Sequence, residues 1–214
     1  MPLDRPSRER DLLELLLVYA LIIAIIWSPE KAQAILTPLA LIVTLLVVLA
    51  RRPSRDDLGF GTRGLLRSLW ILPAAAAIAL AGILVAARYV TLHRLYHANA
   101  GHVIGYVLWT IYQQLLLQDL FMDRLLRLGL GVPAAVTIGG LMFASAHLPN
   151  MTLTAATAVW GIISCVLFRR YHNLWMLGLA QGLLGLCFAV CVPDVLQHHL
   201  RVGLGYLTYH PSQQ

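Results

Sequence analysis

Long uncharged segments constrain what this chain can fold into more than any other feature. The segments 32–50, 69–87 and 174–192 each hold at least eighteen consecutive residues without Asp, Glu, Lys or Arg, which is the length and composition of a helix that crosses a bilayer. Hydrocarbon offers the backbone no hydrogen-bond partners, so such segments must satisfy their own N–H and C=O groups as helices. The sequence therefore predicts an all-α membrane protein.

The composition agrees with this prediction. Hydrophobic residues make up 59% of the chain and charged residues only 12%, whereas about a quarter of the residues of a soluble domain are charged. The net charge of +6 would suggest nucleic acid in a soluble protein, but loops on the cytoplasmic side of membrane proteins also collect Lys and Arg. We therefore expect the lipid bilayer as a partner and no nucleic acid.

The apolar segments predict a polytopic helical bundle of about seven to eight spans, forming one integral membrane domain over residues 1–214. The expected spans are approximately 12–27, 32–50, 69–87, 103–126, 134–147, 153–168 and 174–192. With the N-terminus inside, twelve of the 16 Lys and Arg residues fall on the inner side. This distribution predicts a cytoplasmic N-terminus, in a bacterial inner membrane.

A charged loop precedes the third expected span. After it, Leu65, Leu66 and Leu69 are interspersed with Arg63 and Arg67. An apolar face beside basic residues is typical of a helix that lies in the membrane interface. We therefore expect a short interfacial helix before residue 69.

The expected span 103–126 is unusual because it contains Gln113, Gln114, Gln118 and Asp119. Polar side chains at membrane depth are costly and usually face a bundle interior or a cavity. Gln114 and Gln118 are four residues apart and therefore share one helix face. Glutamines also join helices by hydrogen bonds across an interface, so the residues leave open a polar pocket and a purely structural role.

Two later segments carry further polar residues. The segment 134–147 ends in Phe143-Ala-Ser-Ala-His147, and Gln181 lies in the middle of 174–192. Near Gln181, Gly178, Gly182 and Gly185 would let another helix approach closely. His147 and Gln181 would be either satisfied polar residues or parts of the same pocket as the glutamines.

These three pieces, in this order, resemble the CPBP family (CAAX prenyl protease and bacteriocin-processing proteins, also called ABI), which are intramembrane metalloproteases. In that family one helix carries Glu-Glu-x-x-x-Arg, a later one Phe-x-x-x-His, and a third His-x-x-x-Asn. The resemblance covers about residues 58–190. It implies a CAAX-protease-like fold, hydrolysis of a membrane-embedded or prenylated peptide, and a divalent metal such as zinc if the protein is active.

Carried over by position, Phe143 and His147 match the second motif. Gln113 and Gln114 stand at the acidic pair and Gln118 at the arginine. Gln181 stands at the second histidine, with Gly185 at the asparagine. The resemblance thus implies catalytic positions at Gln113, Gln114 and His147, and a substrate pocket lined by Gln118, Phe143, Gln181 and Trp109. A second register pairs Gln118 and Asp119 with Arg124 but has the wrong spacing.

The amides alter what this site could do. A neutral amide is a poor base and a weak ligand for a dication, so three hypotheses stay open. The first is a protease homologue with altered catalysis. The second is a pseudoenzyme that binds a helix, a lipid or a partner in the same pocket. The third is a histidine–metal enzyme acting on a lipid-like substrate, with His147, His198 and His199 as metal ligands, since imidazole suits zinc.

Overall fold

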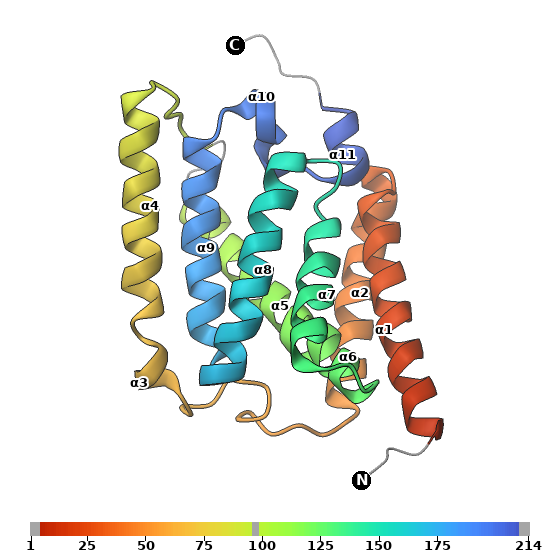
Figure 1. Ribbon diagram of the computed structural model, residues 1–214. Coiled ribbons are helices and arrows are strands. Elements are labelled where there is room, and N and C mark those ends of the chain that lie inside the picture. The colour runs from red at the N-terminus through yellow and green to blue at the C-terminus, as the bar shows by residue number, and fades with distance from the viewer. Residues whose placement is uncertain (1–4, 96–98, 210–214) are drawn as a thin grey trace. The chain divides into compact units, whose positions relative to one another are not determined.

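The computed structural model describes residues 5–95 and 99–209, and over these residues it consists of helices and connecting loops without a β-strand (Figure 1). This confirms the predicted all-α fold. The chain divides into two compact units, one formed by Met1–Pro53, Leu116–Cys165 and Arg201–His210 and the other by Ser54–Leu115, Val166–Leu200 and Pro211–Gln214.

In the first unit, helix α1 packs along α2, and the π-helix η1 contacts both α2 and α7. Its elements are α1 (Arg5–Ile26), α2 (Glu30–Leu49), the π-helix η1 (Leu116–Met122), α6 (Asp123–Arg127), α7 (Val132–Ser145), the first part of α8 (Met151–Tyr171) and α11 (Gly203–Leu207). The short α6 contacts both α1 and α7. This unit therefore joins the N-terminal helices to η1, α6 and α7.

In the second unit, one helix packs against two others: α9 contacts both α4 and α5. The elements are α3 (Leu65–Ser68), α4 (Ile71–Arg88), α5 (Ala100–Leu115), the end of α8, α9 (Leu174–Cys191), α10 (Asp194–Gln197) and the 3-10 helix η2 (His198–Leu200). The short helix expected before residue 69 is present as α3.

Four helical segments are long and apolar enough to cross a membrane, namely Glu30–Leu49, Leu65–Arg88, Met151–Tyr171 and Leu174–Cys191, and Val132–Ser145 is a shorter apolar helix. Many of their large side chains face outward; Ile35, Leu46 and Leu84 are 72%, 64% and 62% exposed. Exposed apolar surface of this extent along whole helices suits lipid. The protein is thus an integral membrane protein, and the expected seven to eight spans remain a prediction.

The expected span 103–126 is not a uniform α-helix. Here α5, the π-helix η1 and α6 follow one another without a break in the chain. A π-helix hydrogen-bonds residue i to residue i+5 and is frequently found at functional sites. Hydrophobic periodicity did not reveal this change of hydrogen-bond pattern.

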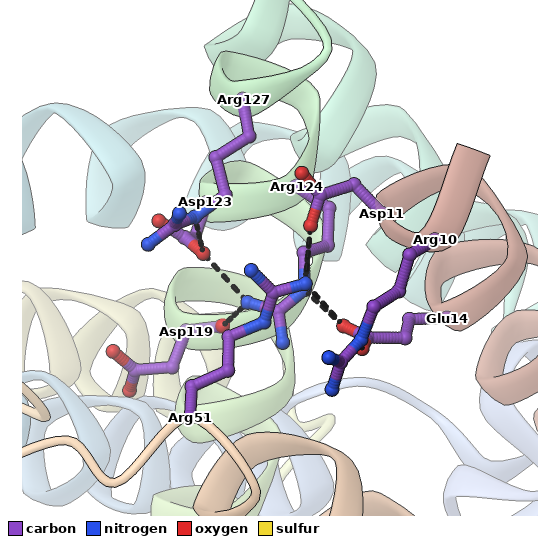
Figure 2. Close-up of polar contacts among 8 residues, drawn as sticks. All are labelled: Arg10, Asp11, Glu14, Arg51, Asp119, Asp123, Arg124 and Arg127. Atoms are coloured by element: carbon purple, nitrogen blue, oxygen red, sulfur yellow. Dashed lines mark hydrogen bonds and ion pairs between the residues drawn. The ribbon is translucent and has the colours of Figure 1, made fainter. Parts of the chain in front are cut away.

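A network of charged side chains lies inside the first unit (Figure 2). Arg124 on α6 is only 2% exposed, and its Nε is 2.9 Å from Glu14 Oε2 on α1 while its Nη1 is 2.6 Å from Asp123 Oδ2. Arg51, just after α2, pairs with Asp11 and lies 2.8 Å from Glu14 Oε2. Buried charges are tolerated only when they are paired and hydrogen-bonded. The network therefore fixes α1, the end of α2 and α6 to one another.

We predict that Arg124→Ala lowers the free energy of unfolding by about 1.5–3 kcal/mol, because it removes the buried guanidinium whose charged hydrogen bonds join Glu14 to Asp123. The matched control is Arg127→Ala. Arg127 also pairs with Asp123, at 2.8 Å, but its side chain is 42% exposed, so the loss should be about 1 kcal/mol or less. Denaturant unfolding of detergent-solubilised protein, followed by circular dichroism, measures both. Equal losses would contradict the assigned burial of Arg124.

Candidate functional site

The glycines of α9 allow α5 to pack directly on its backbone. A Cβ at Gly178 would lie 2.5 Å from Ile111 Cγ1 and 2.8 Å from Ile111 Cα, and a Cβ at Gly182 would lie 3.2 Å from Thr110 Oγ1. The Thr110 hydroxyl donates a hydrogen bond to the Gly178 carbonyl at 2.9 Å. The glycine spacing on 174–192 therefore predicted a close helix approach correctly, and the approaching helix is α5.

Three glutamine amides form a hydrogen-bonded chain between these two helices. Gln114 Nε2 donates to Gln181 Oε1 at 2.6 Å, and Gln181 Nε2 donates to Gln113 Oε1 at 2.5 Å. Gln114 is fully buried, whereas Gln113 and Gln181 are half-buried. The structure thus brings together three of the residues predicted for the site. Their contacts are those expected of amides that join two helices.

Trp109 lies on α5 one turn before Gln113. Its side chain is 42% exposed, and its ring centroid lies 5.4 Å from that of Tyr112. Trp109 is close to the amide chain in sequence, and its aromatic surface is open to a ligand. Its place in a substrate pocket stays a prediction.

Phe143 and His147 form a local pair in the first unit. The His147 Nδ1 lies 2.9 Å from the Phe143 carbonyl oxygen, and the two rings are 5.1 Å apart, edge to face. Because a carbonyl only accepts, Nδ1 carries the proton and Nε2 is the nitrogen with an available lone pair. Phe143 is 4% exposed. The motif spacing therefore places an oriented imidazole at the end of α7.

Another contact near His147 has no signal in the sequence. The Tyr19 hydroxyl on α1 is 2.6 Å from Ser145 Oγ, two residues before His147. The Tyr19 ring also packs edge to face on Phe121 of η1, with 5.9 Å between the centroids. Since residues 19 and 145 are 126 positions apart, local patterns could not predict this contact.

Gln118 and Asp119 both lie in η1. Gln118 is 1% exposed, and its Nε2 is 3.4 Å from Ser164 Oγ on α8. Asp119 Oδ2 is buried and makes no hydrogen bond to any other part of the described chain. The Arg124 Nη1 donates to the Asp119 backbone carbonyl at 3.2 Å. An unpartnered buried carboxylate oxygen is costly, so Asp119, which entered the sequence analysis only as a polar residue of this span and in the second register, is a further candidate functional residue.

The π-helix also bears on the second motif register. In that register Asp119 and Arg124 are separated by one residue too many for the family motif. A π-helical turn holds one more residue than an α-helical turn, so residues five apart come onto the same side. The extra residue that made the register unattractive coincides with η1. This extra residue was the signal in the sequence from which a π-helical turn could have been expected.

His198 and His199 belong to the second unit, and both lie in the 3-10 helix η2. His199 Nδ1 is 3.1 Å from Asp194 Oδ1, an ion pair when the imidazole is protonated. Across residues 5–95 and 99–209, no three His, Cys, Asp or Glu side chains come together as metal ligands would. The metal site at His147, His198 and His199 stays a prediction.

The amide chain also bears on the metal that the family resemblance implies. Divalent cations in catalytic sites are held by carboxylates and imidazoles. Gln113, Gln114 and Gln181 supply neither, and the hydrogen bonds of the amide chain engage them with one another. These three residues therefore do not fit a resident divalent metal.

We predict that Gly178→Ala destabilises the protein by about 1–3 kcal/mol, because the added methyl overpacks the contact with Ile111. Gly105→Ala on α5 is the matched control: a Cβ there has nothing within 4 Å. Removing a helical glycine should then be neutral or stabilise by up to about 1 kcal/mol. Thermal unfolding of the two variants in detergent tests this. A destabilised Gly105→Ala with an unaffected Gly178→Ala would disprove the assigned packing.

Comparison with known proteins bears on the same segment. Residues 100–187 match the family model described as type II CAAX prenyl endopeptidase Rce1-like. No curated protein and no solved structure matches the chain. The matched residues include the amide chain of α5 and α9 and the Phe143–His147 pair, which carried the resemblance in the sequence. Over residues 100–187, this chain is therefore similar to the type II CAAX prenyl endopeptidase Rce1-like family.

Proposed function

We propose that this protein is a CAAX-protease homologue that binds a membrane-embedded or prenylated peptide without hydrolysing it through the family's paired-acid chemistry. The observation that carries the proposal is the amide chain Gln114–Gln181–Gln113. It occupies the positions at which the resemblance puts the two glutamates and the second histidine.

The chemistry of amides supports this proposal. Peptide hydrolysis needs a group that takes a proton from the attacking water, and its pKa must lie near the working pH. A glutamine amide has no such pKa and carries no charge to hold a dication. Gln181 also uses its oxygen toward Gln114 and its nitrogen toward Gln113. These groups stabilise the contact of α5 with α9 and are poorly suited to activating water.

The surface of α5 supports a binding role. Ile104, Leu108 and Trp109 are 60%, 60% and 42% exposed and lie within three turns of Gln113. An apolar and aromatic face suits an isoprenoid chain or a membrane helix. The prenylated or membrane-embedded peptide implied by the family is therefore the ligand class that we assign to this face.

A second candidate function is hydrolysis with a displaced base, which the buried Asp119 favours. Its Oδ2 has no hydrogen-bond partner among the described residues, and it lies in a π-helix, a feature enriched at functional sites. In this alternative the Asp119 carboxylate would take the proton of a water that attacks the peptide carbonyl. The proton would then pass to the departing amine.

One experiment separates the two functions. The full chain is reconstituted in liposomes with a fluorescent peptide that carries a farnesylated cysteine and a C-terminal tail beyond it. Anisotropy measures binding, mass spectrometry measures tail release, and the same peptide without the farnesyl group is the control. We expect saturable binding that needs the farnesyl group and no tail release above that of empty liposomes.

Single-residue variants distinguish the two proposed functions in this assay. Tail release that Asp119→Asn abolishes and Gln113→Ala leaves intact would replace the first function by the second. Release that is lost in Gln113→Ala or Gln114→Ala would contradict both, because the amides would then act directly. Absence of both binding and release would also contradict the proposed peptide ligand.

We also propose seven to eight spans, a cytoplasmic N-terminus and a bacterial inner membrane. The distribution of the basic residues supports this arrangement. Twelve of the 16 Lys and Arg residues fall on one side when the spans alternate as expected, in line with the positive-inside rule. A tag on the N-terminus that is reached from outside in intact cells would contradict this orientation.

A further inference from the structure

A basic face lies at one end of the second unit, on the loop 54–64, α3 and the turn between α8 and α9. Figure 1 shows α3 and this turn at the same end of the helices. Five exposed arginines belong to this face: Arg55, Arg63, Arg67, Arg169 and Arg170. Its acidic residues are Asp56 and Asp57, so the face carries a net positive charge.

The loop is held against the α8–α9 turn by hydrogen bonds to its backbone carbonyls. The donors are the Leu174 N–H to Gly59 O at 2.8 Å, His172 Nε2 to Asp57 O at 2.9 Å, Trp175 Nε1 to Phe60 O at 3.0 Å and Asn173 Nδ2 to Gly61 O at 3.3 Å. Four consecutive residues of the turn thus bind four of five consecutive loop residues. The loop 54–64 and residues 172–175 thus form one hydrogen-bonded platform, and the arginines project from it or lie next to it.

Two glycines make this close approach possible. Gly59 and Gly64 have φ values of +69° and +71°, and a Cβ at Gly64 would collide with the Tyr171 carbonyl. Only glycine adopts this backbone freely and leaves room for the neighbouring chain. The backbone of Gly64, the residue after Arg63, thus lies against Tyr171. The centroid of the Tyr171 ring lies 5.5 Å from the Arg170 guanidinium carbon.

Exposed aromatic and apolar side chains border the arginines. Leu66 is 81%, Trp70 49% and Trp175 40% exposed, and two apolar segments of membrane-spanning length, Leu65–Arg88 and Leu174–Cys191, begin here. Tryptophan is enriched where a membrane helix meets the lipid headgroups. The platform therefore lies at headgroup depth, at the start of these two segments.

Asp57 is used within the loop itself. Its Oδ2 accepts hydrogen bonds from the Ser54 hydroxyl at 2.7 Å and the Ser54 N–H at 2.9 Å, and these bonds lower the pKa of the Asp57 carboxyl. The carboxylate thus shapes the turn that precedes Gly59. The arginine side chains make none of the four bonds that hold the loop to the turn.

We propose that the face formed by Arg55, Arg63, Arg67, Arg169 and Arg170 binds the headgroup phosphate of an anionic phospholipid. Guanidinium groups recognise phosphate by paired hydrogen bonds and stay charged at every physiological pH. A negatively charged headgroup is complementary in charge to this face and present at its depth. The proposal concerns lipid recognition and stands independently of the proposed peptide binding.

The test uses the detergent-solubilised full chain and a fluorescent phosphatidylglycerol, with unlabelled phosphatidylglycerol or phosphatidylcholine as competitor. We expect phosphatidylglycerol to compete at least about tenfold better at low salt, and the preference to shrink as salt rises. Arg169→Gln with Arg170→Gln should weaken phosphatidylglycerol binding by about tenfold or more, since two of the five positive charges near the membrane surface are removed.

The matched control is Arg88→Gln with Arg94→Gln. Both arginines are exposed, and Arg88 lies at the other end of α4, about 27 Å from its start for 18 residues. This control should bind as the unmodified protein does. An equal loss in both double variants, or no preference for phosphatidylglycerol, would overturn the proposal. If the first variant unfolds without lipid, Arg63→Gln with Arg67→Gln gives the same comparison.

Discussion

Polar side chains buried in this protein have to find their partners inside it, because lipid offers no hydrogen bonds. Each unit has a cluster that meets this requirement by its own means, although Asp119 Oδ2 in the first unit has no hydrogen-bond partner among the described residues. In the first, Arg124 is enclosed by Glu14 and Asp123, with Arg51 extending the network to Asp11. In the second, an amide chain joins α5 to α9. Each set ties together segments that lie far apart in the sequence.

The amide chain lies where α5 approaches the glycines of α9 closely. The amides form neutral hydrogen bonds there, and none of the three groups needs a metal or a proton to be satisfied. The amides therefore satisfy one another at the α5–α9 contact, and function has to be argued from the site.

The sequence was sufficient to predict the features that depend on local patterns. Uncharged segments predicted the helical membrane class, the glycines predicted a close helix contact, and the family registers predicted that Gln113, Gln114 and Gln181 belong together. All three concern periodicity or short spacings, which side-chain hydrophobicity and size encode directly. The span count and the roles of the site residues remain predictions.

Other features depend on tertiary structure and could not be read from local patterns. Glu14 and Arg124 are 110 residues apart, and nothing near either residue identifies its partner. The π-helix η1 differs from an α-helix only in which backbone groups bond, so hydrophobic periodicity did not distinguish it. The hydrogen bonds that join the loop 54–64 to residues 172–175 likewise end on backbone carbonyls, which every residue has.

The central claim is that the amides of Gln113, Gln114 and Gln181 hold two helices together. A double-mutant cycle on Gln114→Ala and Gln181→Ala, measured as free energies of unfolding in detergent, tests it most directly. The structure predicts that the two losses are coupled by about 1 kcal/mol, the scale of hydrogen bonds between membrane helices. Losses that simply add would contradict the amide chain as a structural link.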